Sequence, residues 1–248
     1  MHLRSRIIPY LLIRKKGLVK TINFKNDKYV GDPINAVKIY NEKEVDELAI
    51  FDIDATAEGR EPSYDQLRDI AIESRMPLCY GGGVTTAQQA SKIISLGFEK
   101  ISISAAALQR PMLIKEIAEE IGKQSVVVTL DVKKGGFLGG GYMVYSHNAT
   151  RKHKGNLMDF VSAAEAFGAG EIVINNISLD GMMTGYDLDL SKMVRAGTKL
   201  PLTCVGGAGG VEDMSDLIKA IGICGVGVGS FFVFKGPYKA VLISYVRP

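Results

Sequence analysis

The chain has 248 residues, with 30 Lys+Arg against 27 Asp+Glu, and its formal net charge of +3 is too small to predict a nucleic-acid partner. Cys79, Cys204 and Cys224 lie in or beside apolar runs without metal-ligand spacing, so we expect buried thiols, no metal site and no cofactor. The first apolar run, residues 7–13, is too short to span a membrane and is followed by basic residues, so we expect a cytoplasmic protein without a targeting segment.

Eight apolar runs alternate with amphipathic segments along the chain. This order predicts one domain over residues 1–248, a (β/α)8 TIM barrel whose parallel strands are covered by helices. Two helices are expected to begin with capping boxes, at Ser63 with Gln66 and at Thr85 with Gln88. The predicted strands are residues 7–13, 48–53, 77–80, 100–104, 126–130, 172–177, 202–205 and 225–229.

The sequence repeats itself. Residues 80–108 match 205–233 without a gap, and both copies are a strand, a glycine turn, a helix and a strand. Residues 31–54 match 155–178, so we expect two half-barrels of one plan. When the strand starts are aligned as well, Leu12 falls opposite Asp131.

Glycine turns at Gly81-Gly82-Gly83 and at residues 206–210 precede the helices of the matching units. Glycine lets backbone N–H groups approach a phosphate closely, and a helix N-terminus favours negative charge. Small residues end the next strands, at Ser104-Ala105 and Gly229-Ser230, so the sequence predicts two facing anion pockets that suit a ligand with phosphates at both ends. The alternative is that these are only tight turns.

Asp131 ends the fifth strand, where a carboxylate of such a barrel can exchange protons with substrate. A glycine-rich loop follows it and is expected to be a mobile hairpin over the site. Leu12, at the corresponding position of the first half, cannot transfer a proton. Other polar candidates near strand ends, each equally able to cap a helix or orient a loop, are Asp52, Asp54, Ser146, Asn175, Asn176, Asp180 and Gly181.

Four charged residues mark the opposite end of the barrel. Arg6, Glu47, Lys100 and Glu171 each begin a predicted strand, which places two cations and two anions at the floor. They are either structural ion pairs or a gate whose side chains swing to admit a small neutral molecule, and the residues alone do not decide between these.

These features together resemble the cyclase subunit of imidazole glycerol phosphate synthase, the HisF type. In that family a HisH-like glutaminase docks on the floor, and ammonia passes up the barrel to a bisphosphate substrate. The resemblance implies that the four floor charges are the gate and that Gln124 belongs to the interface. It places Gly82, Ser104, Asp180, Gly181, Gly207, Gly229 and Ser230 at phosphate sites, and Lys20 and Asp52 at substrate sites. The motifs are RIIP at Arg6, GDP at Gly31, DEL at Asp46, YGGG at Tyr80, KISI at Lys100, LDVKK at Leu130, GAGEI at Gly168, GYD at Gly185, GGAG at Gly206 and GSFFVF at Gly229.

The chain departs from the family where it has Tyr10-Leu11-Leu12, because the family ends this strand with a second catalytic aspartate. It is more similar to a divergent branch that shares GLVKT, GDPINAVKIYNEKEVDEL, CYGGG and KAVLISY and accompanies surface-polysaccharide (lipopolysaccharide) genes. This resemblance implies ammonia supply for amidine formation on polysaccharide sugars, with a glutaminase and a sugar amidotransferase as partners. The alternatives are the cyclase of histidine biosynthesis and a non-catalytic scaffold that activates the glutaminase on binding a phosphorylated ligand. A sugar-phosphate isomerase is less expected, because it also needs opposed acid and base groups.

Overall fold

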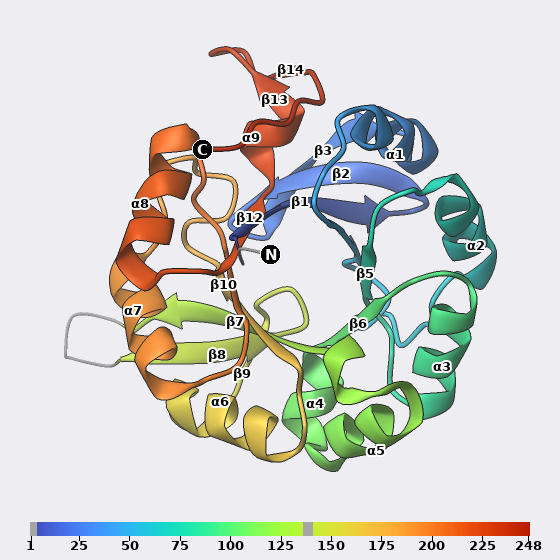
Figure 1. Cartoon of the computed structure of the whole chain (residues 1–248), viewed down its shortest axis with the longest axis vertical. Coiled ribbons are helices and arrows are strands. Elements are labelled where there is room, and N and C mark those ends of the chain that lie inside the picture. The colour runs from blue at the N-terminus through green and yellow to red at the C-terminus, as the bar shows by residue number, and fades with distance from the viewer. Residues whose placement is uncertain (1–3, 136–140) are drawn as a thin grey trace.

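The computed structural model describes residues 4–135 and 141–248. It contains a closed ring of eight parallel strands surrounded by helices (Figure 1), which confirms the predicted (β/α)8 barrel. In order around the ring the strands are β1 (Arg6–Arg14), β4 (Leu48–Asp52), β5 (Leu78–Gly81), β6 (Lys100–Ile103), β7 (Val126–Lys134), β10 (Glu171–Asn176), β11 (Leu202–Val205) and β12 (Gly225–Val228), which pairs with β1.

Helices cover the outside of this ring (Figure 1). They are α1 (Pro33–Glu42), α2 (Tyr64–Glu73), α3 (Ala87–Ser95), the short α4 (Ala105–Gln109), α5 (Met112–Ile121), α6 (Leu157–Ala166), α7 (Leu188–Gly197) and α8 (Val211–Ile221), with a 3-10 turn η1 (Lys123–Ser125). None of the helices in the described ranges is long and apolar enough to cross a membrane.

The eighth unit ends differently from the others. After β12 comes a single helical turn, α9 (Ser230–Val233), and then the short pair β13 (Phe234–Lys235) and β14 (Ala240–Val241), which projects from the rim of the barrel (Figure 1). The chain returns to the barrel through Tyr245, whose hydroxyl donates to the carbonyl of Ile7 at 3.2 Å.

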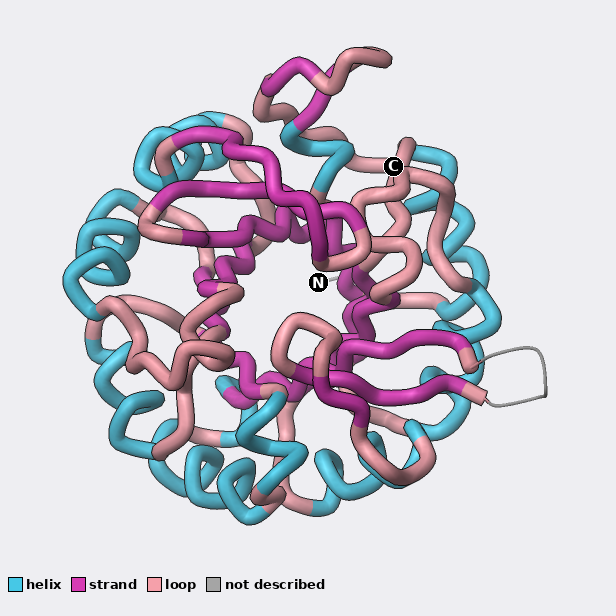
Figure 2. Tube along the Cα trace, turned by 180° about the vertical axis from the view of Figure 1, so that it is seen from behind, coloured by secondary structure: helices cyan, strands magenta, loops and turns pink. Residues whose placement is uncertain are grey.

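Antiparallel extensions rise from two of the barrel strands. β2 (Gly17–Ile22) and β3 (Lys25–Gly31) continue from β1, and β8 (Tyr142–Ser146) and β9 (Arg151–Lys152) continue from β7. Figure 2 shows both sets in front of the ring, on the face opposite to that of Figure 1. The predicted glycine-rich hairpin is the β7–β8 pair, and its tip, residues 136–140, lies outside the described residues.

Two apolar clusters hold the barrel together. The larger fills the space between strands and helices. A smaller one lies inside the ring, because alternate strand residues face inward, and Tyr10 and Phe51 pack against it. Its buried members are Ile8, Ala49, Cys79, Val127, Val173 and Val205.

The predicted helix caps need correction. The capping box of α3 is formed by Thr86 and Gln89, one residue later than expected, because the helix begins at Ala87. Ser63 precedes α2 but makes no side-chain capping bond. The side chain of Gln66 instead donates to the carbonyl of Lys16 at 2.8 Å, which ties α2 to the turn after β1.

Candidate functional site

A cavity of about 300 Å³ opens at the carboxyl ends of the barrel strands. The structure brings together most of the residues that the sequence predicted for this end, and contact with a ligand stays a prediction. These residues are Lys20, Asp52, Gly82, Gly83, Ser104, Asp131, Asn175, Asp180, Gly181, Gly207, Gly229 and Ser230. Of the other candidates, Asp54 and Asn176 do not line the cavity, because Asp54 is held by Arg14 and Asn176 donates to Asp187, whereas Ser146 does line it. Leu12 lines the same cavity.

Asp131 is the carboxylate best suited to proton transfer. The amide nitrogen of Asn175 donates to its Oδ1 at 3.0 Å, across the β7–β10 pairing. Burial raises the pKa of Asp131 to about 7, against the hydrogen bond from Asn175 and with a further contribution from the charge of Asp180. A carboxyl group that titrates near neutral pH can both accept and return a proton.

Lys20 and Asp180 form a buried ion pair in the cavity wall. Their side chains meet at 2.7 Å, and the hydroxyl of Thr21 donates to the other oxygen of Asp180 at 2.7 Å. The backbone N–H of Asn23 donates to the carbonyl of Asp180 at 2.9 Å. The β2–β3 extension is therefore fastened to the loop after β10, and the charge of Lys20 is already balanced.

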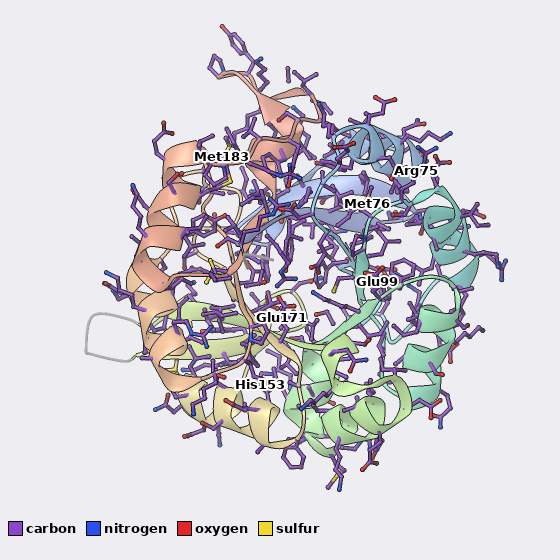
Figure 3. The ribbon with its side chains drawn as sticks, in the orientation of Figure 1. Arg75, Met76, Glu99, His153, Glu171 and Met183 are labelled. Atoms are coloured by element: carbon purple, nitrogen blue, oxygen red, sulfur yellow. The ribbon has the colours of Figure 1, made fainter. Side chains whose placement is uncertain are left out.

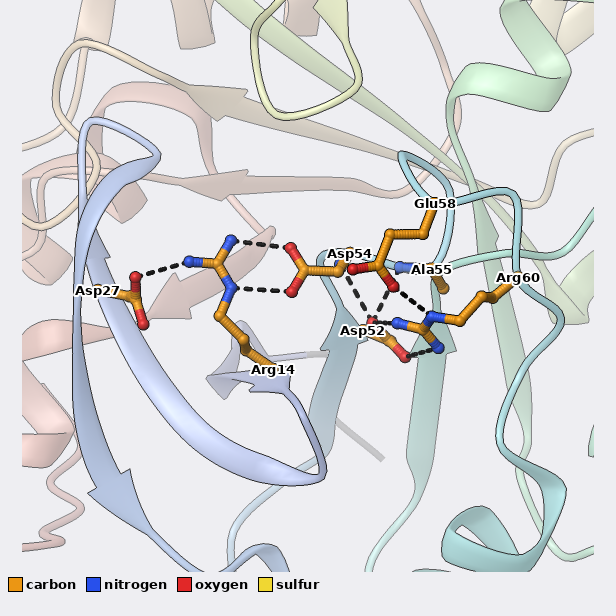
Figure 4. A network of polar contacts seen from close by, with 7 residues as sticks. All are labelled: Arg14, Asp27, Asp52, Asp54, Ala55, Glu58 and Arg60. Carbon is orange, nitrogen blue, oxygen red and sulfur yellow. Dashed lines mark hydrogen bonds and ion pairs between the residues drawn. The ribbon is translucent and has the colours of Figure 1, made fainter.

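Asp52 is occupied by its own loop (Figure 4). Its Oδ1 accepts from the backbone N–H groups of Asp54 at 3.1 Å and Ala55 at 3.0 Å, and Arg60 contacts its carboxylate at 3.3 and 3.4 Å. Arg14 holds the carboxylate of Asp54 through two bonds of 2.8 Å. The geometry thus gives both aspartates a role in shaping the loop after β4, whether or not Asp52 also touches a ligand.

The two glycine turns are sterically closed to side chains. Gly82 has a φ of +123°, and a Cβ there would lie 2.4 Å from the carbonyl oxygen of Asp52. Gly207 has a φ of +112°, and a Cβ there would lie 2.0 Å from that of Gly185. Near the first turn, the hydroxyl of Ser104 is buried without a hydrogen-bond partner among the described residues. Close backbone approach and an unpaired hydroxyl both suit an anionic ligand.

The four floor charges form a closed ring of ion pairs. Arg6 bonds to Glu47 and, at 2.6 Å, to Glu171, while Lys100 contacts the same two carboxylates at 2.8 and 2.9 Å. Thr203 adds a bond of 2.5 Å to Glu171. Figure 3 shows Glu171 near the centre of the barrel and Arg75 at its periphery.

Electrostatics favour the ionised ring. Burial raises the pKa of Glu171, but the charges of Lys100 and Arg6, with hydrogen bonds from Arg6 and Thr203, outweigh it and leave that pKa below its ordinary value.

Glu47 lies one residue before β4 instead of on it. Gln124 is exposed in η1, directly before the floor end of β7, where an interface residue was predicted.

The sequence analysis missed part of the cavity lining, including His147, Asn148 and Thr21. His147, Asn148 and Ala149 form a turn with φ values of +53°, +53° and +63°. The hydroxyl of Ser146 is hydrogen-bonded to Nδ1 of His147 at 2.9 Å and to Nε2 of His153 at 2.7 Å.

No group of three or more potential metal ligands occurs in residues 4–135 and 141–248.

Comparison with known proteins gives matches that cover almost the whole chain. The family model described as "Histidine biosynthesis protein" matches residues 6–238. The "Putative imidazole glycerol phosphate synthase subunit hisF3" of Vibrio vulnificus is 53% identical over 246 residues, which cover 99% of this chain and 94% of the relative. The "Putative imidazole glycerol phosphate synthase subunit HisF" of Leptospira interrogans is 50% identical over 243 residues, 98% of this chain and 95% of the relative.

A third relative is more distant. The "Imidazole glycerol phosphate synthase subunit HisF" of Thermobifida fusca is 36% identical over 223 residues, which cover 89% of this chain and 87% of the relative. Of these three relatives, the Vibrio and Leptospira proteins therefore resemble the chain more closely.

Proposed function

The chain belongs to the histidine biosynthesis protein family as a divergent HisF-type subunit, and we propose that it carries ammonia from a glutaminase to an amination reaction. The glutaminase docks at the barrel floor, and the ammonia serves amidine formation on sugars of a surface polysaccharide. The observation that carries this proposal is the pairing of a complete floor ring with an incomplete cavity, in which Leu12 stands where a second carboxylate is needed.

The floor ring supports the first half of the proposal. It spans the lumen between strands from both half-barrels, so its opening connects the floor with the inside of the barrel. The lumen above it is lined largely by apolar side chains. An apolar passage of this kind admits neutral ammonia at a lower free-energy cost than ammonium, because a bare cation loses its hydration there.

The cavity supports the second half. Asp131 has the environment of a proton-transfer group, but Leu12 offers no partner for it across the barrel. Loss of one general acid or base lowers a rate by about 10² to 10⁴. Ring closure to an imidazole is therefore a poor fit, whereas delivery of ammonia to a further protein, a sugar amidotransferase, requires only the passage.

The test uses the purified barrel with a HisH-like glutaminase from the same genome. We expect the two to form a complex and the barrel to raise the rate of glutamine hydrolysis. The variant Glu171→Gln, in the floor ring, is expected to change this stimulation, while Lys115→Met, on the outside of α5, leaves it unaltered. A barrel that neither binds nor stimulates the glutaminase would overturn the proposal.

One observation favours a second candidate, the cyclase of imidazole glycerol phosphate synthase. The pKa of Asp131 near 7 and its bond from Asn175 are suited to acid–base catalysis. The purified barrel is incubated with an ammonium salt and the bisphosphate imidazole precursor of that reaction, beside a Leu12→Asp variant. Turnover by the unmodified chain supports the cyclase, and turnover by the variant alone supports ammonia delivery.

A further inference from the structure

Tyr10 and Phe51 form a stacked aromatic pair inside the barrel. Their ring centroids are 5.4 Å apart and their planes differ by 14°. Both rings line the upper cavity and also pack on the lumen cluster beneath it. The pair therefore lies between the cavity and the floor ring. Each of the two residues is four positions beyond a member of that ring on its own strand segment, Arg6 or Glu47, which corresponds to about 13 Å along the strand.

Two strand glycines make room for these rings. A Cβ at Gly81 would lie 2.6 Å from two ring atoms of Phe51, and a Cβ at Gly227 would lie 2.6 Å from Cγ2 of Val205 and 2.9 Å from Cε2 of Tyr10. Neither glycine has a backbone conformation that requires glycine. Their small size therefore has a packing reason: it lets the rings lie against β5 and β12, where larger residues would displace them.

The rings lie between a cavity lined in part by polar side chains and an apolar layer. Ser102 and Thr129 share a hydrogen bond of 2.6 Å and line the cavity, whereas Ile8, Ala49 and Cys79 are buried below the rings and do not line it. Burial, followed by the neighbouring Cys79, raises the pKa of Tyr10 far above its ordinary value, so the phenol is neutral. The layer between the floor ring and the cavity thus offers an ion no compensating charge.

We propose that Tyr10 and Phe51 are selectivity residues of the lumen, an aromatic closure that opens by ring movement to neutral small molecules and rejects ions. Hydrophobic constrictions exclude ions by dewetting, and the cost of stripping water from an ammonium group adds to this. The inference rests on the proposed function for its meaning, because the neutral molecule would be ammonia. The closure itself depends only on residues of this barrel and needs no partner protein.

Cys79 reports on the closure, since it lies in the apolar layer below the rings and does not line the cavity. The barrel is treated with methyl methanethiosulfonate, which is neutral, or with its 2-aminoethyl analogue, which carries an ammonium group. Modification of Cys79 is followed by mass spectrometry, and each rate is divided by that of the denatured chain. Cys204, buried in the outer cluster, reports any general loosening of the fold in the same sample.

In the unmodified protein we expect the neutral reagent to reach Cys79 at least about tenfold faster than the cationic one, a difference of ~1.4 kcal/mol. Phe51→Leu keeps an apolar side chain but removes the stack. It should accelerate both reagents at Cys79 and narrow their ratio, while Cys204 remains slow. Tyr10→Phe keeps both rings and should leave the ratio unchanged.

Three outcomes would overturn the inference: equal rates for the two reagents in the unmodified protein, no change in Phe51→Leu, or an equal rise at Cys204. If Lys100→Met changes the ratio and Phe51→Leu does not, the floor ring alone selects. The labelling needs no partner, so its result is independent of glutaminase stimulation. If the labelling shows the expected selectivity but the barrel does not bind a glutaminase, the aromatic closure stands and the proposed ammonia function fails.

Discussion

Replacing Lys100 by methionine removes the charge at one corner of the floor ring while keeping an unbranched side chain that is one atom shorter. Lys100 contacts Glu47 and Glu171 at 2.8 and 2.9 Å, and both carboxylate side chains are only 6% exposed. After the substitution the two carboxylates share the single charge of Arg6. One negative charge then remains buried without its own partner, and methionine cannot hydrogen-bond to it.

The size of the effect depends on which class of ion pair the ring belongs to. Exposed pairs contribute about 0 to 1 kcal/mol, whereas removal of one partner of a buried pair costs about 3 to 5 kcal/mol. The side chain of Lys100 is 19% exposed and its partners are far less so, so we expect a loss of about 3 kcal/mol in the free energy of unfolding. For a domain of this size that loss lowers the thermal midpoint by about 6 to 12 °C.

Urea denaturation and thermal melts measure this loss, and α5 supplies the control. Lys115→Met makes the same chemical change at a pair with Glu119 that is 3.7 Å long and whose side chains are 56% and 67% exposed. It should cost less than about 0.5 kcal/mol. In the double variant Lys100→Met/Glu171→Gln charge balance returns, so part of the stability should be recovered. If Lys100→Met costs no more than Lys115→Met, the ring is ordinary solvated surface and the reasoning fails.

Three further predictions follow from single sites. Because burial holds the pKa of Asp131 near 7, the unmodified protein loses stability as the pH rises from about 4 to 7. Asp131→Asn should therefore be more stable than the unmodified protein by up to about 4 kcal/mol at pH 8, and by nearly nothing at pH 4. Denaturation at both pH values measures this difference. Gly207→Ala should lower the free energy of unfolding by about 2 to 4 kcal/mol through the clash with Gly185. The control Gly222→Ala, at a φ of +76° with no atom within 4 Å of the added Cβ, should lower it by about 1 to 2 kcal/mol. Equal losses of stability in the two variants would show that the clash is relieved. Thr86→Ala should cost about 1 kcal/mol by uncapping α3, and Ser63→Ala close to none, so a loss at Ser63 would contradict the observed caps.

The barrel was predictable because its signals are repeated and local. Apolar runs of strand length alternate with amphipathic helices, and two half-barrels carry the same glycine turns. Parallel strands bring their carboxyl ends to one face, so residues at those ends converge without any knowledge of side-chain geometry. For the same reason the strand starts at Arg6, Lys100 and Glu171 converge at the other face.

Contacts made by long-range geometry were not predictable. The sequence left open whether Asp52 touches a ligand or orients its own loop, and it gave no sign that Arg60, eight residues away, contacts the Asp52 carboxylate. His147 lines the cavity because the turn after β8 has residues with positive φ. That turn contains no glycine or proline from which it could have been predicted. The one-residue error at the α3 cap arose because Thr85 and Thr86 are both competent caps, and in the structure Thr86 caps the helix, which begins at the buried Ala87.

The two proposed closures, the floor ring and the aromatic pair, lie in series and place a condition on the proposed transport through this barrel. If opening the floor ring costs about 3 kcal/mol, it is open in less than about 1% of free molecules. If moving the ring of Phe51 costs ~1.4 kcal/mol, the aromatic closure is open in about a tenth of them, and both are open together in less than about 0.1% when the two move independently. A protein docked on the floor can stabilise only the first opening by direct contact, and a ligand in the cavity only the second. Under the proposed function, free ammonia would therefore leak little through the unoccupied barrel, and appreciable flow would require that both ends be occupied.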